Sequence, residues 1–338
     1  MSAPIAHGGG ITAAAAVFGG RPEEWLDLST GINPCPVALP EIPARAWHRL
    51  PDRHLVDEAR CAARDYYGCG EILPLPVPGT QSVIQLLPRL VARSRGVAVT
   101  DNRIAVVSPT YGEYARAFAA AGFAVDAVGD IAAIGAEHRL AVVVNPNNPD
   151  GRAWPAEVLI ALHDRVKSQN GLLVVDEAFG DADPALSLAA SAGELSNLVI
   201  FRSFGKFFGL AGLRLGFAIA RGDILERFEE WLGPWSVSGP ALSLADSLLR
   251  QDVSAIRRRI NERSAGLHSV LTGAGLRIAG GTALFTLVAD EKAGDIYTHL
   301  CRHHILVRKF DYAPDWLRFG LTPDPAADRR LDEALQRF

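Results

Sequence analysis

Between residues 75 and 220 the chain alternates short strands that are apolar at nearly every position with stretches of helical periodicity. A strand that is apolar on both faces has to be covered on both faces, as in a mostly parallel sheet between two layers of helices. The pattern therefore predicts an α/β fold. The expected strands are 104–107, 140–144, 172–175, 198–201 and 215–220, and the expected helices are 81–92, 113–121 and 156–168.

The pattern changes after Gly233, where longer helical stretches precede short strands. This change predicts a second, smaller α+β domain. The predicted organisation is an arm at 1–40 that packs on the small domain and the functional site, a large domain at 41–235 and a small domain at 236–338. The elements expected in the small domain are helices at 241–251, 253–272 and 325–338 and strands at 284–288, 305–307 and 317–321.

Charge and cysteine usage exclude several classes of function. A formal net charge of -4 gives no support for a nucleic-acid partner. The four cysteines form no C-x-x-C pair and have no spacing typical of a metal site, so we expect reduced thiols in a cytoplasmic protein and no metal. The apolar run 11–18 is too short to cross a membrane, and no Lys or Arg precedes it.

Lys206 is one of only four lysines, and Phe204, Phe207 and Phe208 surround it in the sequence. Desolvation lowers the pKa of an amine toward the neutral, nucleophilic form, which a lysine that attacks a carbonyl group needs. An isolated lysine is more often a surface residue. The run 202–216, which also carries Ser203, Arg214 and four glycines, favours the functional interpretation.

Polar residues follow two of the predicted strands at their carboxyl ends, where an open parallel sheet binds its ligands. Asp176 comes directly after strand 172–175 and can pair with a positive charge on a ligand, although a helix cap or a buried ion pair is the alternative. Asn148 follows strand 140–144 and can donate its amide to an oxygen, although turn chemistry is the alternative.

A third group of residues suits an anion and an aromatic ring. Gly79, Thr80 and Gln81 open a predicted helix, and free N–H groups at a helix start bind anions. Ser203 and Arg214 flank Lys206 and can complete such a cradle. Tyr111 follows another strand and can stack on a ring, or can simply be a half-buried tyrosine.

One ligand, pyridoxal phosphate, matches all of these side chains at once. Its aldehyde suits Lys206, its ring nitrogen suits Asp176 and its phenolate suits Asn148, so Lys206 and Asp176 are the predicted catalytic residues. The residues predicted for its phosphate and its ring face are Gly79, Thr80, Gln81, Ser203, Arg214 and Tyr111.

Three motifs carry a family resemblance: N-P-N-N-P-D-G at 145–151, D-E-A-F at 176–179 and G-L-A-G-L-R-L-G at 209–216. The chain resembles the fold-type I pyridoxal-phosphate enzymes of the aspartate aminotransferase superfamily over essentially its full length. The resemblance implies a large domain built on a mostly parallel seven-stranded sheet, a small α+β C-terminal domain and a homodimer.

Features outside the cofactor motifs are similar to one branch of that superfamily. The chain is similar to histidinol-phosphate aminotransferases and more so to the threonine-phosphate decarboxylases of cobalamin biosynthesis. The features are A-H-G-G at 6–9, G-I-N-P at 31–34, P-W-S-V at 234–237, and Phe179 where most aminotransferases carry a tyrosine.

Two positions depart from the pattern of many relatives. Leu50 precedes Pro51 where many relatives have a tyrosine that reaches across a dimer to the cofactor phosphate, and Gly205 replaces a serine before the lysine. These departures leave the groups at Lys206, Asp176 and Asn148 unchanged.

The resemblance also implies substrate-binding residues. Arg318 matches the position that binds the substrate α-carboxylate, and Arg308, His7 and Asn33 are candidates for a distal phosphate. The expected activity is decarboxylation of L-threonine O-3-phosphate to (R)-1-aminopropan-2-yl phosphate, a lyase reaction of cobalamin biosynthesis. The alternatives are an aminotransferase of the histidinol-phosphate type and a cofactor-binding protein without turnover.

Overall fold

The fold, obtained as a computed structural model that describes residues 7–93 and 103–338, contains two sheets. The larger has seven strands in the order β2-β8-β7-β6-β5-β3-β4. Its strands from β7 to β4 are parallel, which confirms the predicted mostly parallel seven-stranded sheet. The strands are β2 (Leu75–Val77), β3 (Arg103–Val107), β4 (Ala124–Val128), β5 (His138–Val144), β6 (Leu172–Asp176), β7 (Leu198–Ser203) and β8 (Gly216–Ala220).

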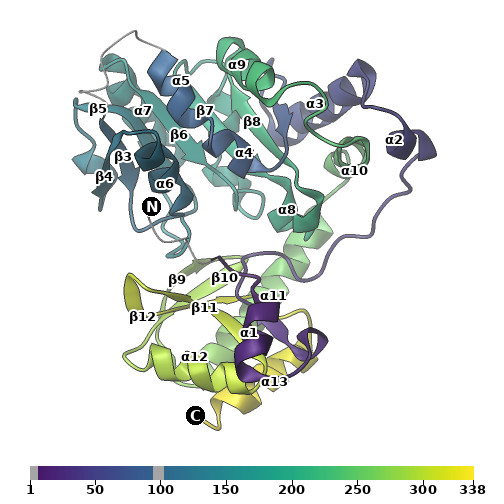
Figure 1. The fold of residues 1–338 in the computed structure, drawn as a ribbon, viewed down its shortest axis with the longest axis vertical. Helices are drawn as coiled ribbons and strands as arrows, with labels where there is room; N and C mark the ends of the chain where they lie inside the picture. The colour runs from purple at the N-terminus through teal and green to yellow at the C-terminus, as the bar shows by residue number, and fades with distance from the viewer. Residues whose placement is uncertain (1–6, 94–102) are drawn as a thin grey trace.

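Helices cover both faces of this sheet (Figure 1). Along β5, Leu140, Val142 and Val144 belong to one buried cluster, whereas Ala141 and Val143 belong to another. This alternation explains why the strands are apolar at every position. The helices on the first face are α4 (Thr80–Ile84), α5 (Leu87–Arg93), α6 (Glu113–Ala120) and α9 (Gly222–Leu232), and those on the second are α3 (Arg53–Tyr67), α7 (Ala156–Ser168) and α10 (Gly239–Leu249).

Two sequence-based predictions about this sheet need correction. The predicted helix 81–92 is two helices, α4 and α5, because Pro88 lacks the N–H that would bond to the carbonyl of Ile84. The predicted strand 215–220 is present as β8, but it runs antiparallel to its neighbours β7 and β2. An edge strand β4 and the helices α3 and α9 were not predicted.

The smaller sheet has the order β1-β11-β12-β10-β9. Its first strand comes from the N-terminal arm and pairs in parallel with β11, whereas the other pairs are antiparallel. The strands are β1 (Leu26–Leu28), β9 (Ile278–Thr282), β10 (Phe285–Ala289), β11 (Ile305–Phe310) and β12 (Ala313–Gly320), and the helices that accompany them are α1 (Ile11–Phe18), α11 (Ser254–Gly273), α12 (Ala293–Arg302) and α13 (Pro325–Leu335).

Two helices near the predicted domain boundary belong to different parts of the fold. The helix α10 packs against α3 and against the short α2 (Ala44–His48), whereas α11 reaches down to the small sheet and packs on α13 and β10 (Figure 1). The boundary at 235/236 stays a prediction, and these contacts favour a boundary after α10. The remaining short helices are α8 (Phe204–Phe207), Pro22–Glu24, Ile131–Ala133, Pro184–Leu186, Ala189–Ser191 and Ala211–Leu213.

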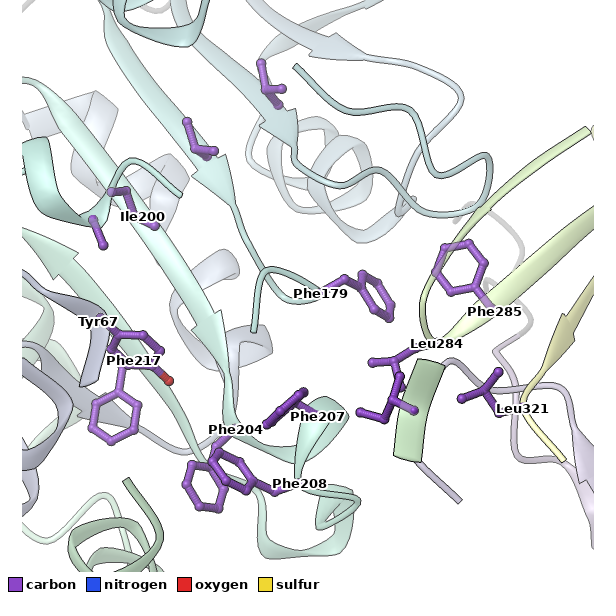
Figure 2. Packing of buried hydrophobic residues seen from close by; sticks show 14 of the residues in the cluster. Tyr67, Phe179, Ile200, Phe204, Phe207, Phe208, Phe217, Leu284, Phe285 and Leu321 are labelled. Atoms are coloured by element: carbon purple, nitrogen blue, oxygen red, sulfur yellow. The ribbon is translucent and has the colours of Figure 1, made fainter. Parts of the chain in front are cut away.

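Aromatic side chains fill the space around α8. Phe204 and Phe208 stack with their ring centres 4.5 Å apart, and Phe207 packs edge-on against Phe208. Figure 2 shows Phe179, on the loop after β6, facing Phe285 at the start of β10, with ring centres 5.1 Å apart. These contacts join the large sheet to the small one beside Lys206. Within residues 7–93 and 103–338, none of the helices has the length and apolar character needed to span a bilayer.

Candidate active site

A cavity of about 620 Å³ lies where the carboxyl ends of the parallel strands face the small sheet and the arm. Every residue predicted for the site except Asn33 lines this cavity. The predicted residues that the structure brings together are His7, Gly79, Thr80, Gln81, Tyr111, Asn148, Asp176, Ser203, Lys206, Arg214, Arg308 and Arg318.

Lys206 lies in α8 and lines the cavity. Burial lowers the pKa of the amine to about 8, the positive charge of Arg318 acts in the same direction, and the nearby Asp176 opposes both. The Nζ atom lies 6.0 Å from the ring centre of Phe179. Near pH 8 the amine of Lys206 is therefore neutral in a much larger fraction of molecules than the amine of an ordinary surface lysine.

Asp176 is the last residue of β6 and is buried. The hydroxyl of Tyr114 donates to Oδ2 at 2.7 Å, and the backbone N–H of Ala178 donates to Oδ1 at 3.0 Å. Burial raises the pKa of this carboxyl to about 6, although both hydrogen bonds and Lys206 lower it. A positive charge bound beside Asp176 would restore the carboxylate form.

The turn after β5 places Asn148 at the cavity because its neighbours build the turn. The side chain of Asn145 donates to the carbonyl of Trp154 at 3.0 Å, and the side chain of Asn147 donates to the carbonyl of Pro109 at 2.9 Å. Turn chemistry is therefore the role of Asn145 and Asn147. Asn148 instead accepts a hydrogen bond from Nη1 of Arg318, which leaves its amino group as the donor toward the cavity.

Arg308 and Arg318 are paired residues on the neighbouring strands β11 and β12. Burial, and then the charge of Arg308, lower the pKa of Arg318 to about 10, and burial lowers the pKa of Arg308. Arg318 also donates from Nη2 to the carbonyl of Ser29 at 2.8 Å, but its buried Nε has no partner among the described residues. Two adjacent guanidinium groups in a closed site favour a ligand with more than one anionic group.

The start of α4 and Arg214 come very close together at the other end of the cavity. Gly79 has a φ of 72°, and a Cβ at this position would lie 2.7 Å from Nη2 of Arg214. Only glycine leaves room here for the guanidinium and for an anion next to it. Gly205 is required by the same kind of contact, because a Cβ there would lie 2.6 Å from Cα of Ala211. This close approach explains why a serine does not precede Lys206.

Tyr111 belongs to a chain of polar contacts at the mouth of the cavity. Its hydroxyl donates to Oε1 of Gln81 at 3.0 Å, and Nε2 of Gln81 donates to Oε2 of Glu113 at 3.1 Å. The side chain of Gln81 is thus bonded to protein groups, while Thr80 beside it also lines the cavity. Glu113, the first residue of α6, was not predicted as a site residue.

The sequence matches the family described as "Aminotransferase class I and II" over residues 23–338. The chain belongs to this family. The membership confirms the resemblance that the motifs predict.

Two relatives and one solved structure are similar to the chain. A threonine-phosphate decarboxylase from a Sinorhizobium species is 62% identical over 338 residues, which cover 100% of this chain and 99% of that protein. Another, from Pseudomonas aeruginosa, is 43% identical over 99% of this chain and 98% of that protein. The crystal structure of histidinol-phosphate aminotransferase from Sinorhizobium meliloti in complex with pyridoxal-5'-phosphate matches with a TM-score of 0.82 at 20% identity, over 99% of this chain and 96% of that chain. This last likeness concerns the fold alone.

The cavity of this aminotransferase-family chain fits pyridoxal phosphate on its own geometry. It contains an amine of lowered pKa at Lys206, a buried carboxylate at Asp176 and an amide donor at Asn148. The space next to Gly79 and Arg214, which a Cβ would fill, suits a phosphate group. The individual roles of these residues stay predictions.

Asn33 lies outside the cavity lining. Its Nδ2 donates to the carbonyl of Phe207 at 2.9 Å, its backbone N–H donates to the carbonyl of Lys206 at 2.9 Å, and its Oδ1 accepts from the N–H of Cys35 at 2.9 Å. Asn33 therefore ties the arm to α8 with the same groups that would have to bind a substrate phosphate.

Several residues of the cavity were not predicted, among them Thr30, Thr110, Phe310 and Tyr312. Phe310 and Tyr312 follow Arg308 near the turn into β12, and Thr30 follows β1. The rule that ligands gather at the carboxyl ends of parallel strands points to Thr110 and Glu113, which follow β3. No local pattern distinguishes the other residues.

Proposed function

We propose that this chain is a pyridoxal-phosphate-dependent threonine-phosphate decarboxylase. It releases CO2 from L-threonine O-3-phosphate and forms (R)-1-aminopropan-2-yl phosphate, for cobalamin biosynthesis. The observation that carries this proposal is the full-length similarity to two proteins named threonine-phosphate decarboxylase, at 62% and 43% identity. The paired guanidinium groups in the cavity support it, since the substrate carries a carboxylate and a phosphate.

Pyridoxal phosphate, when bound, supplies an aldehyde that takes up an amine and a ring that accepts electrons from the substrate Cα. Lys206 would hold the aldehyde carbon before the substrate arrives and would move a proton at Cα afterwards. Asp176 would keep the ring nitrogen protonated, and Asn148 would donate to the phenolate oxygen. Thr80, Ser203 and Arg214, which line the cavity, would hold the phosphate, and Tyr111 would cover the ring face.

Arg318 and Arg308 orient the substrate. Arg318 binds the α-carboxylate, because it is the buried member of the pair and its Nη1 already contacts Asn148 at the cofactor end of the cavity. Arg308 and His7 bind the distal phosphate. Which bond to Cα breaks depends on how the carboxylate is held relative to the ring, so Arg318 selects decarboxylation over loss of the Cα proton.

The proposal is tested by adding L-threonine O-3-phosphate to the purified, cofactor-loaded protein and measuring CO2 together with the amine product. We expect one CO2 for each 1-aminopropan-2-yl phosphate formed, without any keto acid. Transfer of the amino group to 2-oxoglutarate with no CO2 would show an aminotransferase instead. Absence of turnover with a full complement of cofactor would point to a binding protein.

We also infer a homodimer in the cytoplasm. Trp47, Leu50 and Trp235 are large apolar side chains that are 62%, 65% and 58% exposed, and Pro51 and Trp235 line the same surface groove. Exposed apolar groups that gather in one region are typical of a protein interface. The four cysteines are unpaired, as expected of thiols in a reducing compartment.

A further inference from the structure

Residues 7–9 of the N-terminal arm lie beside the cavity, and this short segment is held at both ends. On the small-sheet side, the N–H of Gly9 donates to Oγ of Ser29 at 2.7 Å. A Cβ on Gly8 would lie 2.3 Å from the carbonyl oxygen of Ser29, so the backbone packs directly on that residue. The same carbonyl accepts from Arg318, which places this end of the arm beside the proposed carboxylate site.

The other end of this short segment is held by Glu113 of the large sheet's helix layer. Nε2 of His7 donates to Oε1 of Glu113 at 3.0 Å, because a carboxylate can only accept. His7 is half-exposed, whereas Glu113 is only 5% exposed. A buried carboxylate costs free energy unless it is hydrogen-bonded, so the arm supplies part of what keeps Glu113 in place.

The second oxygen of Glu113 connects to the residue that covers the proposed ring face. Oε2 accepts from Gln81, and Gln81 accepts from the hydroxyl of Tyr111. One carboxylate therefore contacts the arm through Oε1 and orients Tyr111 through Oε2 and Gln81. The ring centres of His7 and Tyr111 lie 6.0 Å apart, so the two groups that this carboxylate holds adjoin each other over the cavity.

We propose that Glu113 is a positioning residue that couples the position of the arm, through His7, to the orientation of Tyr111, through Gln81. Glu113 does not touch the reacting atoms. It sets the position of His7 on the substrate side and of Tyr111 on the cofactor side. The substrate half of this inference rests on the proposed function, whereas the Tyr111 half requires only a bound pyridoxal phosphate.

Glu113→Ala removes both connections, and the matched control is Arg116→Ala. Arg116 contacts the same Oε1 at 3.4 Å, but its side chain is 45% exposed and does not line the cavity. We expect Glu113→Ala to weaken binding of pyridoxal phosphate about tenfold and to raise KM for phosphothreonine about tenfold, with a smaller effect on kcat. It should also change the visible circular dichroism of the bound cofactor without substrate. Arg116→Ala should leave the cofactor affinity, KM and kcat within about twofold of the wild type and the circular dichroism unchanged.

Non-additivity tests the coupling itself. His7→Ala acts on a half-exposed residue and is compatible with folding, so we expect it to raise KM by itself but to add nothing in the Glu113→Ala background. If Glu113→Ala fails to fold, Glu113→Met replaces it, since methionine keeps about the same volume and removes both carboxylate oxygens. Additive effects, or circular dichroism and cofactor affinity that stay at wild-type values, would overturn the proposal.

The dichroism and affinity measurements use pyridoxal phosphate alone. They separate a failure of this inference from a failure of the proposed substrate, which would appear as a wild-type protein that does not turn over phosphothreonine.

Discussion

Lys206 destabilises the fold before any cofactor is bound, because its amine binds a proton less tightly in the folded chain than in the unfolded one. Burial lowers its pKa from 10.5 to about 8. Between about pH 8 and pH 10.5 the lysine is therefore more often protonated in the unfolded chain than in the folded one. Stability therefore rises with pH from about 8 to 10.5, and the full cost is present below pH 8.

Replacing Lys206 by methionine should remove that cost in the cofactor-free protein. We expect Lys206→Met to increase the free energy of unfolding by up to about 3 kcal/mol at pH 7, with the gain shrinking above pH 8. Urea denaturation at several pH values measures it. Lys167→Met, on the exposed side of α7, is the control and should give no comparable gain in stability. A gain that does not change with pH would contradict the assigned pKa.

At the scale of elements, a buried ionic group links β7 to the loop after β6. Arg202 donates to Oε2 of Glu177 at 2.5 Å and to Oδ1 of Asp181 at 2.8 Å, and all three side chains are at most 2% exposed. Glu177 adjoins Asp176, so this group fixes the loop directly after the strand end that carries the proposed catalytic carboxylate.

Removing the arginine leaves two buried carboxylates without their cation. We expect Arg202→Met to lower the free energy of unfolding by about 3–5 kcal/mol. Arg103→Met breaks an exposed pair with Asp126, and we expect it to cost at most about 1 kcal/mol. The difference between the two denaturation midpoints measures the effect. Equal, small losses in both variants would show that the buried group does not hold the loop.

The strands β3, β5, β6, β7 and β8 of the large sheet could be predicted because burial on both faces leaves a local signature, whereas the half-exposed edge strand β4 leaves none. The direction of β8 could not be predicted, since an antiparallel strand inside the sheet is as apolar as the parallel strands. The strand β1 was also missed. It has three residues and exists because it pairs with β11, which lies far away in the sequence.

The site also contains residues that local sequence patterns identify and residues that depend on distant partners. Lys206, Asp176 and Asn148 lie next to strand ends, so one topological rule brings them together. Glu113 and Asn33 are defined by partners that are remote in sequence: His7 and Gln81 for the former, and the backbone around α8 for the latter. The topological rule points to the place of Glu113 after β3 but not to its partners, and Asn33 has no local sequence signal.

At the scale of the whole molecule, the proposed dimer follows from the exposed apolar side chains of Trp47, Leu50 and Trp235. Figure 1 shows α2, which carries Trp47, projecting at the side of the large sheet away from the small one. We expect the double variant Trp47→Glu, Leu50→Glu to shift the protein from dimer to monomer by light scattering, because charges would be buried in the interface.

The control for the dimer is Val17→Glu. Val17 is 76% exposed, and its helix α1 packs on α12 beside the small sheet. This variant should remain dimeric. A wild-type protein that is monomeric at micromolar concentration would contradict the proposed assembly.

The most direct test of the central claim gives the cofactor-loaded protein phosphothreonine and histidinol phosphate at equal concentrations, together with 2-oxoglutarate. The two competing reactions are followed as CO2 and as glutamate. The account predicts that kcat/KM for decarboxylation of phosphothreonine exceeds that for amino transfer from histidinol phosphate by at least about 100-fold, since Arg308 and Arg318 suit a substrate with both a carboxylate and a phosphate. Glutamate formed faster than CO2 would contradict it.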